Sequence, residues 1–266
     1  MHIGIIGMGH LGKAFISGLL KSGVEQNQLI VNARTEDTLK VIKSQYPYVT
    51  GVSDKKDLVE KSDIIVIAVK PQNAADVMSE LKKLNLSDKT IISFMAGVTI
   101  NDMKQMLQDQ RGEYHIVRMM PNVGISLCKG IIGVSYENSF PEMPSVMEIF
   151  QQLGYLVYLP EEQLENITIC AASGLAFAAY LMQEYQNSCD RLINNPSVSE
   201  KITMCVFEDV LEIIKSDNSS FAKLIEQIST KGGTTEAGME VLKNSNVKEI
   251  LNKSFDSAYC RVDNLK

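Results

Sequence analysis

Apolar residues in the first 160 positions form short runs, and these runs alternate with segments in which apolar residues recur at helical spacing. The run at 63–69 is rich in β-branched residues, as in a central parallel strand buried on both faces. The alternation predicts a Rossmann-type doubly wound α/β sheet over residues 1–160. The predicted strands cover residues 3–6, 28–32, 63–69, 90–94, 115–119, 131–135 and 155–158, with a further short segment near 49–52.

The pattern changes beyond Pro160, where strand-like alternation almost disappears. Residues 161–266 are therefore expected to form an all-α C-terminal domain that serves substrate binding and dimerisation. The segment 167–181 is apolar nearly all round, so we expect it to be buried in this domain or in a subunit interface. The predicted helices cover residues 164–192, 199–215, 221–228, 235–242 and 247–265, with breaks at 194–196, 217–220 and 232–233.

Composition narrows the class of protein. The 266-residue chain carries a net charge of −6, which disfavours nucleic acid as a partner. Its five cysteines are odd in number and form no C-x-x-C motif, which is typical of reduced thiols in a cytoplasmic protein. We expect no signal peptide and no membrane-spanning helix, because no apolar run looks long enough. The three histidines are not paired at ligand spacing, so no metal site is expected.

The chemistry begins at the N-terminus. The first apolar run is followed by Gly7, Gly9 and Gly12 in G-x-G-x-x-G spacing, and then by a helical pattern. The first glycine permits a tight turn, the second lets the backbone approach phosphates, and the third lets helix and strand pack closely. The helix N-terminus then directs its free N–H groups at the anion. This stretch predicts binding of a dinucleotide pyrophosphate.

The end of the second predicted strand bears on the choice of cofactor. NAD-specific folds usually place an acidic residue there to hold the ribose 2′-hydroxyl, whereas this chain has Asn32-Ala-Arg-Thr35. Arg34 could grip a 2′-phosphate with its planar fork of donors, or it could be a solvated loop residue. Glu36 and Asp37 are expected in the first turn of the next helix. We therefore expect NADPH, with NADH as the alternative cofactor.

Four further motifs follow the glycine turn in a recognisable order. They are Val-Lys-Pro-Gln at 69–72, Arg-Met-Met-Pro-Asn at 118–122, Ser-Gly-Leu-Ala-Phe at 173–177 and Lys-Gly-Gly-Thr-Thr at 231–235. With these motifs, its length and its helical second half, the chain resembles the pyrroline-5-carboxylate reductase family over nearly its whole extent. Members of that family are oxidoreductases that make proline by reducing the ring imine of 1-pyrroline-5-carboxylate with a nicotinamide cofactor. They pair a Rossmann domain with a helical domain that forms a homodimer, often assembled further.

The resemblance implies roles for particular residues. It implies that Asn122 borders the nicotinamide ring. The residues implied to contact the rest of the cofactor, from the pyrophosphate and the adenosine ribose towards the nicotinamide, are Gly7, Gly9, His10, Leu11, Gly12, Asn32, Arg34, Thr35, Ala68, Val69, Lys70 and Pro71. It assigns the pocket for the small-molecule substrate to Ser173, Thr230, Gly232, Gly233, Thr234 and Thr235.

The substrate carboxylate could be held by hydroxyls and by N–H groups at the Gly-Gly helix start. A protonated imine already accepts hydride readily, so catalysis would consist mainly of positioning and desolvation. Thr235 is the candidate for a hydrogen bond to the imine nitrogen. For Ser173, on an apolar helix, bonding to the backbone and contact with the substrate are both open.

The substrate-side motifs depart from the family pattern while the nucleotide-side motifs do not. Leu175 and Phe177 stand where the family has Pro and Tyr, and Lys231 replaces Pro. Lys231 could add a positive charge for a different anion or simply lie on the surface. Similar departures occur in some bacterial paralogues, including one encoded with late-competence genes. The alternatives are therefore an NADP-binding regulatory paralogue, or a reductase of a different cyclic imine or of a β-hydroxyacid.

Overall fold

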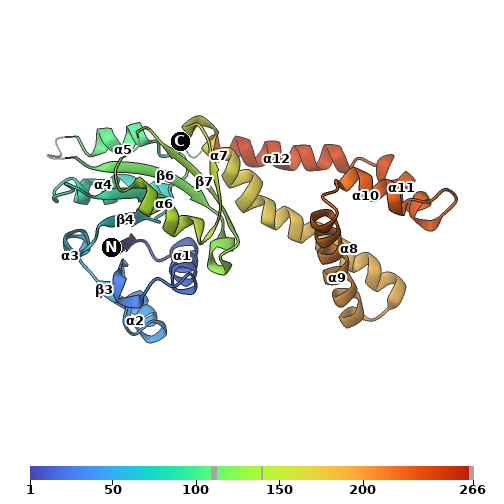
Figure 1. Ribbon diagram of the computed structural model, residues 1–266, viewed down its shortest axis with the longest axis horizontal. Coiled ribbons are helices and arrows are strands. Elements are labelled where there is room, and N and C mark those ends of the chain that lie inside the picture. Colours follow the sequence, from blue (N-terminus) through green and yellow to red (C-terminus); the bar gives the residue numbers. More distant parts are fainter. Residues whose placement is uncertain (109–112, 139, 264–266) are drawn as a thin grey trace. The chain divides into compact units, whose positions relative to one another are not determined.

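The computed structural model describes residues 1–108, 113–138 and 140–263 (Figure 1). The chain divides into two compact units, residues 1–172 with 259–266 and residues 173–258. The first unit is an α/β unit built on one sheet, and the second is entirely helical. The predicted fold class, a Rossmann-type sheet followed by an all-α part, is confirmed.

One eight-stranded sheet, counted over the described residues, runs through the first unit in the order β3-β2-β1-β4-β5-β6-β7-β8. All neighbouring strands pair in parallel except β6 and β7. The strands are β1 (Ile3–Ile6), β2 (Leu29–Asn32), β3 (Thr50–Val52), β4 (Ile64–Ile67), β5 (Thr90–Ser93), β6 (His115–Pro121), β7 (Gly130–Tyr136) and β8 (Gly154–Tyr158).

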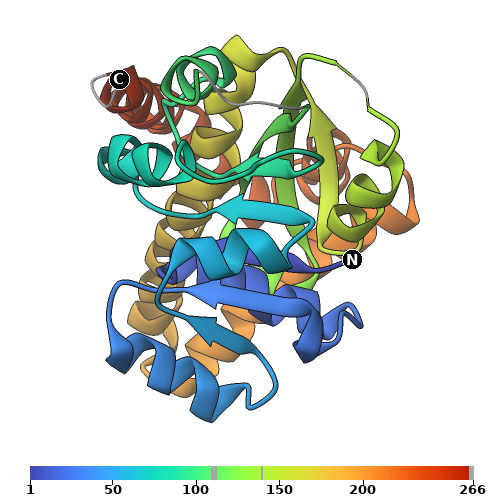
Figure 2. The same cartoon turned by 90° about the vertical axis from the view of Figure 1, so that its left-hand side faces the viewer.

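Helices pack on both faces of this sheet (Figure 2). One face packs against α1 (His10–Lys21), α2 (Glu36–Gln45) and α6 (Met143–Gln151). The opposite face packs against α3 (Lys55–Lys61), α4 (Ala74–Leu81) and α5 (Ile100–Met106). In β4, Ile64 and Val66 join the first core while Ile65 and Ile67 join the second. An apolar residue is therefore needed at every position of β4, which explains its unbroken apolar run.

The antiparallel pairing of β6 with β7 departs from simple strand–helix alternation. Only a 3₁₀ segment, η3 (Val123–Leu127), joins the two strands, and it is too short for the crossover that a parallel pair requires. Asn122 holds this connection. Its side-chain oxygen accepts the N–H groups of Gly124 and Ile131 at 3.1 Å each, and its side-chain nitrogen donates to the carbonyl oxygen of Ala171 at 3.0 Å.

Residues 161–172 pack with the sheet rather than with the helical unit. They form η4 (Glu161–Gln163), α7 (Leu164–Ile167) and most of a π-helical segment, η5 (Thr168–Ser173). The reason lies in Arg118 of β6, which is 1% exposed and donates to Glu161 at 3.1 Å and to Glu165 at 2.8 Å. The first stretch of this unit therefore runs to Ala172, and the chain returns to the unit at Tyr259, whereas the sequence pattern places the domain boundary at residue 160.

The second unit holds α8 (Gly174–Ile193), α9 (Pro196–Ser216), α10 (Phe221–Ile228), α11 (Thr234–Lys243) and residues 247–258 of α12 (Val247–Asp263). The predicted break at 194–196 is confirmed. Asn194 ends α8 with a φ of 53°, and Asn195 caps α9 by accepting the N–H of Val198. Proline at the first position of α9 costs no helical hydrogen bond, because that N–H would have no partner in the helix.

The apolar segment 167–181 is buried only in its first part, where Ile169 and Ala171 are 4% and 6% exposed. Leu175, Tyr180 and Leu181 are 45%, 61% and 43% exposed. For residues 175–181, burial in the interior of the domain is therefore wrong, and burial in a subunit interface stays a prediction.

Helical geometry is continuous from Glu161 to Ile193, and within this run one 18-residue window reaches a mean hydropathy of 1.4, of which 22% is buried. By length and composition it could cross a membrane, which differs from the expectation that no apolar stretch is long enough. A helix over 164–192 was predicted, and the expectation missed the span because it considered unbroken apolar runs, whereas the hydropathy of the window is a mean over all its residues. One such helix is weak evidence, since helices buried in soluble proteins pass the same test.

Candidate dinucleotide and substrate sites

The turn between β1 and α1 has the geometry that its glycines predict. Gly7 has a φ of +102° and donates its N–H to the carbonyl oxygen of Asn32 at 3.2 Å. A Cβ on Gly7 would lie 2.8 Å from the backbone of Ala68, and one on Gly12 would lie 2.1 Å from the oxygen of Gly7. A Cβ on Gly9 would meet nothing within 4 Å. The first and third glycines are therefore required for packing, while the second faces open space.

Helix α1 begins at this turn with its first N–H groups available. Gly9 is the N-cap, and it makes no capping hydrogen bond through a side chain. The first turn of α1, which the structure describes in full, contains no acidic residue. The backbone N–H groups of His10, Leu11 and Gly12 have no acceptor within the helix by position. The partial positive charge of the helix terminus is therefore free to act on an anion.

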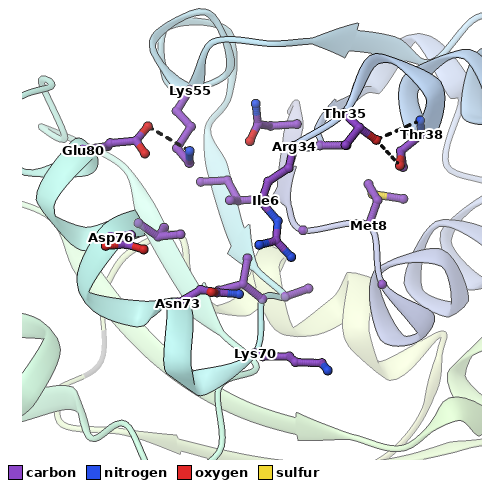
Figure 3. Close-up of a pocket in the computed structure, with 17 residues that line it drawn as sticks. Ile6, Met8, Arg34, Thr35, Thr38, Lys55, Lys70, Asn73, Asp76 and Glu80 are labelled. Atoms are coloured by element: carbon purple, nitrogen blue, oxygen red, sulfur yellow. Dashed lines mark hydrogen bonds and ion pairs between the residues drawn. The ribbon is translucent and has the colours of Figure 1, made fainter.

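A cavity of about 450 Å³ opens beside the turn (Figure 3). It lies at the carboxyl ends of β1, β2 and β4, where parallel sheets bind their ligands. The residues that line it are Ile6, Gly7, Met8, Gly9, Asn32, Ala33, Arg34, Thr35, Thr38, Lys55, Ala68, Val69, Lys70, Asn73, Asp76, Val77 and Glu80.

Most of the sequence-predicted cofactor residues are brought together here. The lining includes Gly7, Gly9, Asn32, Arg34, Thr35, Ala68, Val69 and Lys70. Four of the predicted residues do not line the cavity but adjoin its lining in the chain. They are His10, Leu11 and Gly12, which continue the chain from Gly9, and Pro71, which follows Lys70.

Two asparagines among the predicted residues have side chains with structural partners. The side-chain nitrogen of Asn32 donates to the carbonyl oxygens of Val52 at 3.2 Å and Ser53 at 2.9 Å. Asn122 lies outside the cavity lining, is 5% exposed, and its amide is occupied by the hydrogen bonds that hold η3. Asn32 can therefore shape the cavity wall, while the Asn122 side chain secures the chain behind it.

Arg34 and Thr35 sit where the second strand leads into α2. Thr35 caps α2 by accepting the N–H of Thr38 at 3.3 Å. Figure 3 shows the guanidinium group of Arg34 turned into the cavity. Glu36 and Asp37 occupy the first turn of α2, as predicted. The only charge that residues 32–35 contribute to the cavity is therefore the positive charge of Arg34.

Sequence reasoning missed the far wall of the cavity. Lys55 and Glu80 form an ion pair of 2.8 Å across this wall, and Asp76 lies one turn before Glu80 on α4. Asp76 and Glu80 are spaced i, i+4 with Val77 between them, so they share the face of α4 that lines the cavity. That spacing was a usable signal for α4. Lys55 lies in a polar stretch at the start of a short helix and offered no such signal.

The predicted substrate segment lies in the second unit, at the start of α11. The carbonyl oxygen of Thr230 accepts the N–H of Gly233 at 2.9 Å, and the N–H of Gly232 donates to the carboxylate of Glu236 at 2.7 Å. The N–H groups of these two glycines are therefore already occupied. The free donors are instead the backbone N–H groups of Thr234 and Thr235, the first two residues of α11.

The other substrate candidate, Ser173, lies at the start of α8 and is partly buried. No hydrogen bond between residues that the structure describes joins it to the 230–235 segment. Phe177, where the family has Tyr, packs edge-on against Phe255 at 5.2 Å between ring centroids. The aromatic ring is thus used in packing α8 on α12, a role for which a hydroxyl is not needed.

Two family models match the chain. Residues 2–97 match the NADP oxidoreductase, coenzyme F420-dependent model, and residues 161–265 match the pyrroline-5-carboxylate reductase dimerisation model. The chain is 28% identical to the pyrroline-5-carboxylate reductase of Pasteurella multocida over 259 residues, which cover 95% of this chain and 93% of that protein.

Solved structures agree in fold over the whole chain. A pyrroline-5-carboxylate reductase from Coxiella burnetii aligns with a TM-score of 0.86 and 26% identity, covering 100% of this chain and 98% of that one. The pyrroline carboxylate reductase of Plasmodium falciparum, solved with NADP bound, aligns with the same TM-score and coverage at 21% identity.

Proposed function

Since the chain belongs to the pyrroline-5-carboxylate reductase family, we propose that it catalyses the NADPH-dependent reduction of 1-pyrroline-5-carboxylate to L-proline. The observation that carries the proposal is the glycine turn. An uncapped helix without acidic residues in its first turn begins at the edge of a cavity at the carboxyl ends of β1, β2 and β4.

The residues present fit a dinucleotide. Gly9 leaves room where a larger residue would project towards a bound phosphate, and the start of α1 offers its N–H groups without competition. Val69 and Lys70 extend the lining away from Arg34 along the end of β4. The pyrophosphate would thus lie over residues 7–12, with the adenosine at Arg34 and the nicotinamide beyond Lys70.

The positive charge beside the adenosine favours NADPH over NADH. A 2′-phosphate meets the guanidinium group of Arg34 and the hydroxyl groups of Thr35 and Thr38, whereas an acidic residue here would repel it.

The substrate would be held by the start of α11. The backbone N–H groups of Thr234 and Thr235, together with their hydroxyl groups, can bind the carboxylate, because helix N-termini favour anions. Thr235 is partly buried and is proposed to orient the imine nitrogen through its hydroxyl group, while Thr230, Gly232, Gly233 and Ser173 shape the pocket.

The chemistry asks for little beyond positioning. The bound cofactor supplies a hydride for the imine carbon. The protein's residues hold the ring in a reactive orientation and exclude water from it, and such positioning accounts for large rate enhancements.

A spectrophotometric assay tests this proposal. Purified protein is mixed with pyrroline-5-carboxylate and either NADPH or NADH, and nicotinamide absorbance is followed. We expect turnover with NADPH, and loss of turnover with unchanged NADPH affinity in Thr235→Ala. Ser245→Ala, which removes an exposed hydroxyl that donates to the carbonyl oxygen of Leu242 and accepts the N–H of Val247, is the matched control and should retain wild-type rates. Tight NADPH binding without turnover at any pH would contradict the proposal.

The departures at Leu175 and Lys231 favour one alternative, the reduction of a different cyclic imine. A panel of ring imines and hydroxyacids in the same assay separates the two. A higher kcat/KM for another imine would replace the proposed substrate while keeping the reaction class.

We also propose that the chain acts in the cytoplasm as a homodimer or higher homo-oligomer formed through the helical unit. The matched dimerisation model and the exposed apolar side chains of α8 support this. Leu181→Glu should lower the mass in sedimentation equilibrium to that of a monomer, while the control Lys215→Glu on α9 should not. A wild-type chain that sediments as a monomer would contradict the assignment.

A further inference from the structure

The lining of the dinucleotide cavity carries more charges than the one on Arg34 that the proposed function uses. Arg34, Lys55 and Lys70 supply three positive charges to the lining, and Asp76 and Glu80 supply two negative charges. Lys55 and Glu80 are paired at 2.8 Å (Figure 3). Two carboxylates would be unfavourable neighbours for a phosphorylated ligand unless their charge is already balanced.

Lys55 has an unusual environment for a lysine. Its side chain is only 16% exposed, compared with 62% for Lys56, the next residue on α3. It is also the first residue of α3, where the helix dipole disfavours a positive charge. A lysine held in this position, partly desolvated, needs a nearby anion to offset those costs. In the free protein, Glu80 provides that anion.

The partner of Lys55 is more accessible than Lys55 itself. Glu80 is 50% exposed, so its carboxylate can be hydrated if the ammonium group moves to another anion. The ammonium group is a point charge on a flexible stem and can turn from one acceptor to another. A phosphate monoester offers close to two negative charges and three acceptor oxygens, against one charge and two oxygens for a carboxylate.

We propose that Lys55 is a second cation for the 2′-phosphate, opposite Arg34, and that Glu80 is its competitor in the free protein. The inference rests on the proposed dinucleotide site and assigns its cofactor selectivity to this ion pair. A 2′-phosphate draws the Lys55 ammonium group away from Glu80. An unphosphorylated ribose does not, so Lys55 stays paired and adds nothing to the binding of NADH. The ion pair therefore makes the preference for NADPH over NADH larger than Arg34 alone would give.

The test uses two nucleotides that differ only in the 2′-phosphate, adenosine 2′,5′-bisphosphate and adenosine 5′-monophosphate, titrated calorimetrically into the full-length protein. Lys55→Met should weaken binding of the bisphosphate about tenfold and leave the monophosphate unchanged, since one charge-assisted contact is lost. Glu80→Gln should tighten binding of the bisphosphate several-fold, again without affecting the monophosphate. Lys56→Met, which breaks the exposed Lys56–Glu60 pair on the same helix, is the matched control and should change neither affinity.

Equal weakening of both nucleotides by Lys55→Met would overturn the inference, because it would indicate a structural role. Unchanged binding of the bisphosphate in that variant would also overturn it. If Lys55→Met does not fold, Glu80→Gln still decides, since weaker or unchanged bisphosphate binding contradicts competition. Neither nucleotide contains a nicotinamide, so the outcome is independent of imine reduction. A protein that fails the reductase assay but shows this pattern would lose the proposed substrate and keep the inferred subsite.

Discussion

Replacing Arg118 with Met would remove a buried charged group that ties the sheet to residues 161–172. The guanidinium group is 1% exposed and donates to Glu161 at 3.1 Å, to Glu165 at 2.8 Å and to the carbonyl oxygen of Met95 at 3.3 Å. Glu165, whose side chain is 10% exposed, also accepts the N–H of Gly97 at 2.7 Å. This network therefore joins β6, the loop after β5 and α7.

The loss in the free energy of unfolding follows from the carboxylate charge that stays buried when Arg118 is removed. Without Arg118, the Glu165 carboxylate stays buried with one backbone N–H as its partner. Breaking a buried pair by removing one member costs about 3–5 kcal/mol. The whole stability of a domain is typically about 5–15 kcal/mol, so the loss would be a large fraction of the total.

Urea unfolding followed by circular dichroism, at one fixed protein concentration, measures this loss. Lys104→Met, which breaks the exposed Lys104–Glu137 pair, is the control and should cost less than about 1 kcal/mol. Adding Glu165→Gln to Arg118→Met should recover part of the loss, because the amide keeps an acceptor for Gly97 and removes the unpaired charge. A loss for Arg118→Met no greater than that of the control would refute the reasoning.

The remaining predictions concern the cavity and one helix start. Gly9→Val should leave the melting temperature nearly unchanged and abolish its rise with NADPH, because the side chain meets only open space in the free protein. Gly12→Ala should instead lower the melting temperature itself, since its Cβ would meet a backbone oxygen at 2.1 Å; the reverse pattern would contradict the assigned glycine roles. Arg34→Ala should raise the KM for NADPH by about tenfold or more, the effect expected from losing one charge-assisted contact, and should leave the KM for NADH unchanged in steady-state assays. An equal rise in both KM values would indicate a role other than phosphate recognition. Hydrogen bonds from the side chain and then the backbone of Thr99 hold the pKa of Asp102 below its ordinary value of 3.8. The stabilisation from this carboxylate is therefore present above about pH 4 and is lost as the pH falls through the lowered pKa. Asp102→Asn should then destabilise the protein at neutral pH but not in strong acid, which urea denaturation at several pH values would measure.

Elements that a short stretch of sequence specifies were predictable from the sequence. The run that became β4 is apolar at every position because both faces are covered, and the glycine turn is set by steric limits that act within a few residues. Thr99, a residue type that favours N-caps, caps α5 by accepting the N–H of Asp102 three positions on. In each case the residues that reveal the element lie close together in the chain, so a sequence pattern can predict it.

What the sequence did not reveal depends on residues that are distant along the chain. The cavity role of Lys55 comes from α4, some 25 positions away, and burial of Arg118 comes from carboxylates 43 and 47 positions away. The turn at 230–235 was located correctly, yet the N–H groups of its glycines are occupied by Thr230 and Glu236. Motif spacing identifies the segment, whereas the free donors follow only from its hydrogen bonds.

The transfer of hydride from the nicotinamide to a ring imine can be measured directly with NADPH that carries deuterium at both hydrogen positions of the nicotinamide C4. The purified protein is incubated with this cofactor and pyrroline-5-carboxylate, and the products are analysed by mass spectrometry. The account predicts proline one mass unit heavier than normal, with the deuterium on the former imine carbon. Absence of proline, or proline without deuterium, would contradict it.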